Sequence, residues 1–186
     1  MDSEYFFKKL NEKMKYLLDE EDVFCDIDID DEEELGDASW TSLFNTAVYL
    51  TVHDYNELKD KKDKVKINPE PGGRGGFSDF LIVSNDEKDK LIEIEHENKP
   101  LNKPKTKKRK FKNNIEKSIF NLSSKSNAEK VLITYTFENT RKDVSLNELL
   151  NMIKKYKTNY KLADDIVLIY GENGNDKKEL YKKKII

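Results

Sequence analysis

Hydrophobic residues in the first part of the chain recur at spacings of three and four, which predicts two helices. Within residues 3–18 they are Phe6, Phe7, Leu10, Met14, Leu17 and Leu18. A second stripe comprises Trp40, Leu43, Phe44, Ala47, Val48 and Thr51, and Asp37 is its predicted N-cap. Such stripes are typical of helices that pack one face on a core. We expect 23–29 to be a strand or an extended link, and 59–66 to be a solvated connection or a helix end.

Runs of apolar and β-branched residues in the rest of the chain predict strands that alternate with helices. The expected strands are 77–84, 91–97, 130–137, 166–170 and an edge strand at 179–186, with a turn at 85–90. Ile115, Ile119 and Leu122 mark one helix, and the capping-box pair Ser145 and Glu148 begins another. The pattern predicts a single α/β domain over 1–186, a mixed central β-sheet flanked by helices.

Composition and charge narrow the class of protein. No run approaches the ~20 apolar residues of a membrane span, the N-terminus lacks a secretory pattern, and Cys25 is the only cysteine. We therefore expect a cytoplasmic protein without an internal disulfide or a cysteine-based zinc site. The net charge of −3 divides unevenly, because residues 1–40 carry −11 and the remainder carries +8. The acidic part includes a predicted helical segment at about 1–35. A basic body can bind a polyanion, but a solubilising charge split explains the same numbers.

The expected strand 91–97 places three carboxylates, Glu93, Glu95 and Glu97, on one face. Like charges in a row repel unless solvent or a cation neutralises them. If this strand pairs with 77–84 through the turn, Asp79 comes close to Glu93 and Glu95, as a hard divalent cation requires. The alternative is an exposed sheet face with acidic residues, but the apolar flanks of both strands indicate a central hairpin.

Asp79, the short hairpin and Glu93-Ile94-Glu95 together resemble the PD-(D/E)xK, or restriction-endonuclease-like, nuclease superfamily. The order of elements over 37–137 also resembles its αβββαβ core. Ser78 stands where the motif has proline, and Glu95 replaces the usual lysine, a variation also found in some type II restriction enzymes. The resemblance implies an endonuclease that hydrolyses DNA phosphodiester bonds with Mg²⁺, for which Mn²⁺ can substitute. Asp79, Glu93 and Glu95 would be the metal ligands, with Glu95 alternatively acting as a base.

Some details of this site stay open at the level of sequence. A shifted acidic pair, Glu95-His96-Glu97, is a second possibility that brings Glu97 into the catalytic set, and Lys99 would then be the nearby cation. The family often adds an acid from the preceding helix, for which Glu34, Asp37 and Glu57 are candidates. We expect His96, on the core side of its strand, and His53, in the second helix, to be structural histidines.

Residues 99–112 contain eight cations and no acid, directly after the acidic strand. Such a run can neutralise phosphates in a salt-sensitive manner, although a solvated loop is the plainer interpretation. A glycine-rich loop at 72–76 carries one cation and lacks the Lys-Ser/Thr of a P-loop. The predicted DNA-binding residues are Arg74, Lys105, Lys107, Lys108, Arg109, Lys110 and Lys112.

Three hypotheses follow from these observations. The first is a Mg²⁺-dependent endonuclease, which would act as a homodimer if it cuts both strands. The second is a DNA-binding module that keeps the nuclease fold without catalysis, because the motif lysine is absent at Glu95. The third is a protein-interaction domain in which the acidic N-terminal segment mimics DNA or masks the basic body.

Overall fold

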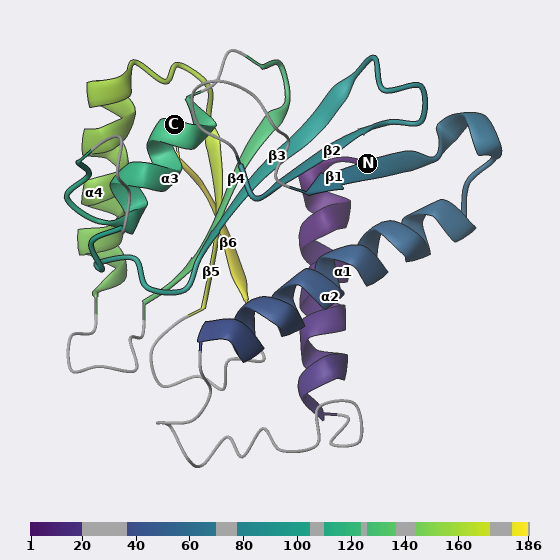
Figure 1. Cartoon of the computed structure of the whole chain (residues 1–186), viewed down its shortest axis with the longest axis horizontal. Coiled ribbons are helices and arrows are strands. Elements are labelled where there is room, and N and C mark those ends of the chain that lie inside the picture. Colours follow the sequence, from purple (N-terminus) through teal and green to yellow (C-terminus); the bar gives the residue numbers. More distant parts are fainter. Residues whose placement is uncertain are drawn as a thin grey trace.

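A mixed six-stranded sheet forms the centre of the chain (Figure 1). In the computed structural model, the described residues are 1–19, 37–69, 78–104, 110–123, 126–136, 144–171 and 180–185. The strands lie in sequence order across the sheet: β1 (Val65–Pro69), β2 (Phe80–Ser84), β3 (Lys90–Glu97), β4 (Glu129–Tyr135), β5 (Ile166–Gly171) and β6 (Tyr181–Ile185). β3, β4 and β5 are parallel, and the pairs β1–β2, β2–β3 and β5–β6 are antiparallel. The predicted α/β class with a mixed sheet is confirmed.

Helices cover both faces of this sheet, as Figure 1 shows. α1 (Ser3–Asp19) and α2 (Asp37–Glu57) pack together on one side, and α3 (Asn114–Leu122) and α4 (Leu146–Tyr160) pack together on the other. A single 3₁₀ turn, Lys61–Asp63, follows α2. The predicted capping box of α4 is present, with Ser145 accepting from the Glu148 amide and Glu148 accepting from the Ser145 amide.

Each face of the sheet has its own hydrophobic core. On the α1–α2 side, Phe6, Leu10, Leu43 and Phe44 are fully buried among residues of β1 to β5. On the α3–α4 side, the predicted helix residues Ile115, Ile119 and Leu122 are fully buried with residues of β4, β5 and α4. The two helical stripes near the N-terminus are therefore core faces, and α1 belongs to the folded domain although its segment of the sequence is acidic.

The sequence prediction was wrong or incomplete in two places. The stretch 59–66 was expected to lack a strand, yet β1 begins at Val65, whose side chain is the buried residue of an otherwise largely exposed edge strand. α2 begins at Asp37, so this residue is the first of the helix rather than a preceding cap. The segment 23–29 lies outside the described residues. From 37 to 135 the described elements run helix, 3₁₀ turn, three strands, helix, strand.

Candidate functional site

The β2–β3 hairpin brings Asp79 next to the acidic strand, as the sequence predicted. Leu81 lies opposite Glu93 and Phe80 opposite Ile94, so Asp79, the residue before β2, comes level with Glu95. The backbone N–H of His96 donates to Asp79 Oδ2 at 2.7 Å and holds this carboxylate against β3. Since side chains alternate along a strand, Asp79, Glu93, Glu95 and Glu97 share one face, the face on which α3 packs.

Glu93 lies in a buried ion pair. Its Oε2 is 2.5 Å from Lys130 Nζ and accepts from the Ser126 hydroxyl at 3.3 Å, and its Oε1 accepts from the Ser78 hydroxyl at 3.3 Å. Lys130, on the neighbouring strand β4, has a fully buried side chain, and Glu93 is 6% exposed. These partners contact both carboxylate oxygens of Glu93 and distinguish it from the two glutamates that follow it. The alternative acidic pair, Glu95 and Glu97, therefore fits the geometry better.

Glu95 is a buried carboxylate with incomplete hydrogen bonding. It is 1% exposed, and its Oε1 accepts from Asn121 Nδ2 at 2.9 Å. Its Oε2 is buried and has no hydrogen-bond partner among the described residues. Burial, reinforced by the charge of Asp79, raises the pKa of Glu95 well above its ordinary value. The Asn121 amide, the charge of Lys117 and the Ser118 hydroxyl partly offset that rise.

Glu97 is half-buried at the carboxyl end of β3. Its Oε1 accepts from Asn114 Nδ2 at 2.8 Å and from the backbone N–H of Lys99 at 3.3 Å. Burial raises the pKa of Glu97 to about 7, and the nearby Lys117 partly offsets that rise. A carboxyl that titrates near neutral pH at the opening of a pocket is suited to proton transfer.

Helix α3 supplies polar partners that the sequence reasoning missed. Asn114, Lys117, Ser118 and Asn121 recur at spacings of three and four beside the apolar stripe of the same helix. Asn114 donates to Glu97 and Asn121 donates to Glu95. The positive charge of Lys117 partly offsets the rise in the pKa of both glutamates. The sequence did contain a signal for these partners. Polar residues recur at the same helical spacing as the apolar residues of this helix, which indicates a second helix face that contacts other groups.

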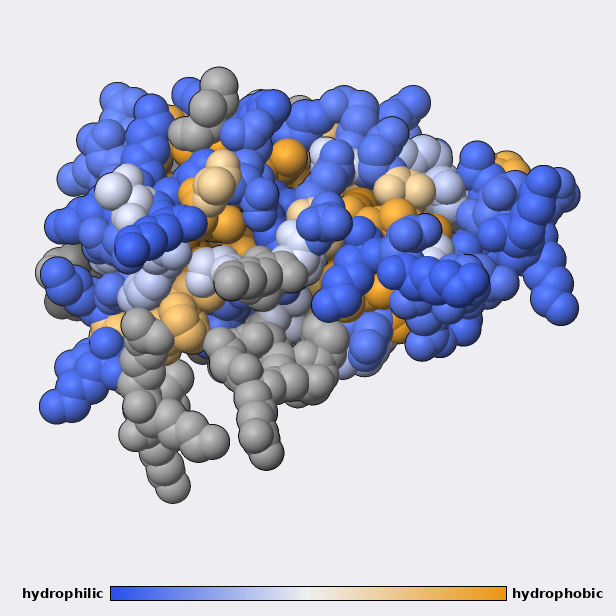
Figure 2. Space-filling model, turned by 90° about the horizontal axis from the view of Figure 1, so that it is seen from above, coloured by the Kyte–Doolittle hydropathy of each residue, from blue (hydrophilic) through white to orange (hydrophobic). Residues whose placement is uncertain are grey.

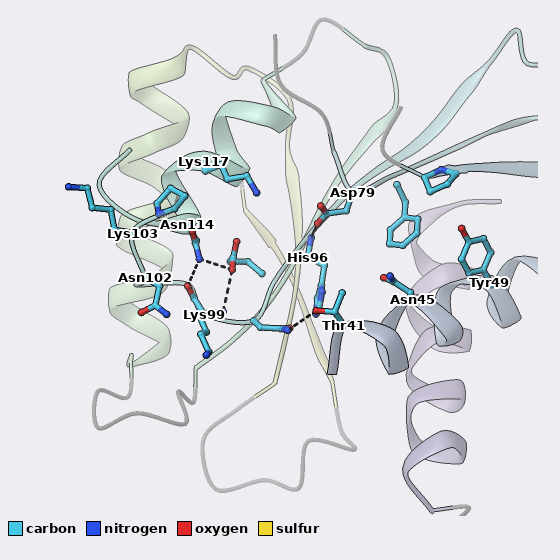
Figure 3. A pocket seen from close by; sticks show the side chains of 15 residues that line it. Thr41, Asn45, Tyr49, Asp79, His96, Lys99, Asn102, Lys103, Asn114 and Lys117 are labelled. Carbon is cyan, nitrogen blue, oxygen red and sulfur yellow. Dashed lines mark hydrogen bonds between the residues drawn. The ribbon is translucent and has the colours of Figure 1, made fainter. Parts of the chain in front are cut away.

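A pocket of about 780 Å³ opens beside these carboxylates, between α2 and α3 at the end of the hairpin (Figure 3). Asp79, Glu97 and Lys117 line it, whereas Glu93 and Glu95 do not. The face of the molecule in Figure 2 is mostly hydrophilic, and the hydrophobic residues visible on it lie between hydrophilic ones. The pocket is also polar for the most part, which suits a charged or hydrogen-bonding ligand better than an apolar one.

The α2 wall of the pocket consists of Thr41, Asn45 and Tyr49, which follow one another at intervals of four. No carboxylate from the described part of α2 lines the pocket. Of the three acids proposed for this helix, Glu57 is exposed outside the pocket, Glu34 lies outside the described residues, and the side chain of Asp37 is not described. The helix thus contributes neutral polar and aromatic groups to the site.

His96 has the structural role that the sequence predicted. Its ring stacks on Phe44 with centroids 3.7 Å apart, and it meets Tyr135 edge-on at 5.8 Å. Burial lowers the pKa of His96 to about 3, so the ring is neutral and forms an uncharged part of the pocket wall. His53 lies outside the pocket, with its side chain 68% exposed on α2 and Asp54 at 3.7 Å.

The carboxylates at this site are of the chemical type that binds a hard divalent cation. Asp79, Glu95 and Glu97 offer carboxylate oxygens, the ligands that Mg²⁺ and Mn²⁺ prefer, and Glu95 Oε2 is buried without a partner among the described residues. However, within the described part of the chain no three Asp, Glu, His or Cys side chains are arranged closely enough to hold a metal ion. Metal binding at this site would therefore require side-chain rotation.

The described part of the basic run begins at this pocket. Lys99 and Lys103 line it, and Lys110 and Lys112 are exposed just before α3. The other predicted DNA-binding residues, namely Arg74, Lys105, Lys107, Lys108 and Arg109, lie outside the described residues.

Comparison with protein-family models, curated proteins and solved structures finds no match to this chain. Among the described helices, none is long and apolar enough to cross a membrane.

Proposed function

We propose that this chain is a Mg²⁺-dependent endonuclease that hydrolyses phosphodiester bonds of DNA. The observation that carries the proposal is the gathering of Asp79, Glu95 and Glu97 on one sheet face, with Lys117 beside them and a polar pocket at their edge. The order helix, three strands, helix, strand around this site is the order that the resemblance to PD-(D/E)xK nucleases implies, which supports the same class.

Each residue has a role that follows from its surroundings. Asp79 and Glu95 would hold the cation, which when bound polarises the phosphate and acidifies a water molecule. Glu97, whose pKa is raised to about 7, would accept the proton of the attacking water at its carboxylate, while the bond from phosphorus to the leaving oxygen breaks and that oxygen takes a proton from solvent. Lys117 provides positive charge toward a phosphate that gains negative charge during the reaction. Lys117 thus supplies, from α3, the cation that the acidic strand lacks.

A cleavage assay tests this function. Plasmid and single-stranded DNA are incubated with Mg²⁺, Mn²⁺ or EDTA, using the wild type and Asp79→Asn, whose amide oxygen can still accept from His96. We expect cutting that requires the divalent cation and falls at least about 100-fold in the variant. The matched control Asp164→Asn, at an exposed position in the loop after α4, should cut as the wild type does.

One observation favours a second candidate, a DNA-binding module without catalysis. The carboxylates as placed do not form a metal cluster within the described residues. This candidate predicts salt-sensitive DNA binding that EDTA does not change and no cutting with any metal. Cleavage lost in Asp79→Asn but retained in Asp164→Asn would exclude it.

A further inference from the structure

The two ends of the pocket differ in charge. Lys99, Lys103 and Lys117 lie at the end formed by α3 and the loop after β3. At the other end α2 presents Asn45 and Tyr49, which carry no charge, and Figure 3 shows the two groups on opposite sides of Asp79. An anionic group is therefore favoured at one end and a neutral, planar or hydrogen-bonding group at the other. A nucleotide has both parts.

Tyr49 provides an aromatic surface at the neutral end. It is one of the few large hydrophobic side chains exposed in the described residues, with 44% of its surface accessible. Its ring meets that of Phe80 at 6.1 Å and 89°, and Phe80 directly follows Asp79. This contact holds the tyrosine on the α2 side of the start of β2, at the pocket that Asp79 also lines, and leaves ring surface accessible. Nucleobases stack on such rings in proteins that bind single strands.

Asparagine amides along the pocket provide hydrogen-bonding groups. Asn98 Nδ2 donates to Thr41 Oγ1 at 3.2 Å, while Asn98 Oδ1 is buried and has no hydrogen-bond partner among the described residues. Asn45 and Asn102 also line the pocket. Each amide group can donate and accept hydrogen bonds, which matches the mixed edge of a base.

We infer that this pocket binds an unstacked base of a DNA strand, with Tyr49 as its stacking surface, so that the substrate class is single-stranded DNA or an unpaired end. The volume of about 780 Å³ lies in the range of sites for small molecules and is large enough for one or two nucleotides. A base inside a duplex would first have to leave its stack. The inference rests on the proposed function for the identity of the ligand as DNA.

Fluorescence anisotropy with a labelled single-stranded oligonucleotide in EDTA tests this inference without catalysis. The wild type should bind the single strand more tightly than a duplex of the same sequence. Tyr49→Ala should weaken single-strand binding about tenfold or more, and Tyr49→Phe should keep it within about twofold, because the ring provides the stacking. The matched control Tyr16→Ala removes another exposed tyrosine, on α1 outside the pocket, and should bind as the wild type does.

Three results would overturn the inference: no binding of the single strand, equal or tighter binding of the duplex, or equal affinity in Tyr49→Ala and Tyr16→Ala. The comparison of single strand with duplex uses the wild type alone, so it stands even if Tyr49→Ala folds poorly. Because EDTA prevents cutting, single-strand binding that depends on Tyr49 supports this inference even if no metal supports cleavage. Cleavage of duplex DNA with no effect of Tyr49 would keep the proposed function and refute this inference.

Discussion

The ion pair between Lys130 and Glu93 should be a major determinant of stability. Lys130 Nζ and Glu93 Oε2 are 2.5 Å apart, with the two side chains 0% and 8% exposed. Lys130→Met would leave the Glu93 carboxylate buried without its cation. Removing one partner of a buried pair costs about 3–5 kcal/mol. The Ser78 and Ser126 hydroxyls, which donate to Glu93 at 3.3 Å, should keep the loss toward the lower end of that range.

Thermal and urea unfolding measure this effect. For a domain of this length the cost corresponds to a fall in Tm of roughly 6–20 °C. The double variant Lys130→Met with Glu93→Gln should lose less stability than the sum of the single changes, since neither charge is then left alone. A matched control is Lys184→Met, which breaks a 2.7 Å pair with Asp165 whose side chains are 64% and 40% exposed, and should cost at most about 1 kcal/mol.

Equal destabilisation by Lys130→Met and Lys184→Met would refute the reasoning. The same series separates Glu93 from the proposed metal site. Glu93→Gln should lower Tm yet keep metal-dependent cleavage at temperatures where the variant is folded. Loss of cleavage in a folded Glu93→Gln protein would instead return Glu93 to the catalytic set that the sequence first indicated.

Further predictions concern pH, charge and the cation. Because burial raises the folded-state pKa of Glu97 from 4.5 to about 7, the unfolded chain ionises first, so metal-free stability should fall as pH rises between these values. Glu97→Gln should flatten this fall, and an unchanged slope in unfolding experiments would contradict the assignment. Lys117→Met should reduce cleavage at least about tenfold and DNA affinity by a smaller factor, and equal losses in both would assign Lys117 to binding alone. Replacing the basic residues of 105–112 with glutamine should weaken DNA binding and flatten its salt dependence, whereas an unchanged salt slope would show that this segment does not bind DNA. Amide replacement of the acids in 20–34 should tighten DNA binding if they mask the basic body, and no change would exclude masking.

Periodicity predicted most of the fold because burial imposes it. The stripes through Phe6 and Leu10, and through Leu43 and Phe44, are fully buried helix faces, and the acidic strand lies in the middle of the sheet. β1 escaped prediction because an edge strand buries little, so its sequence keeps the polar character of a loop. An exposed edge leaves a weak hydrophobic signal.

The candidate site was predicted only in part, for a different reason. Alternation placed the three glutamates on one face, but it does not show which of them meets a buried cation. That depends on Lys130, whose position opposite Glu93 arises from the parallel pairing of β3 and β4. Lys117 and Tyr49 come from separate helices, and their approach to Asp79 is a result of tertiary packing. Local patterns carry no information about such contacts.

The central claim is that Asp79 and Glu95 hold a divalent cation beside Glu97, and calorimetric titration with Mn²⁺ tests it most directly. The wild type should bind Mn²⁺, and Asp79→Asn and Glu95→Gln should each lose most of that affinity. Glu57→Gln, which changes an exposed glutamate at the end of α2 outside the pocket, should bind as the wild type does. The account would be contradicted if the wild type did not bind Mn²⁺, or if both site variants bound it as tightly as the wild type does.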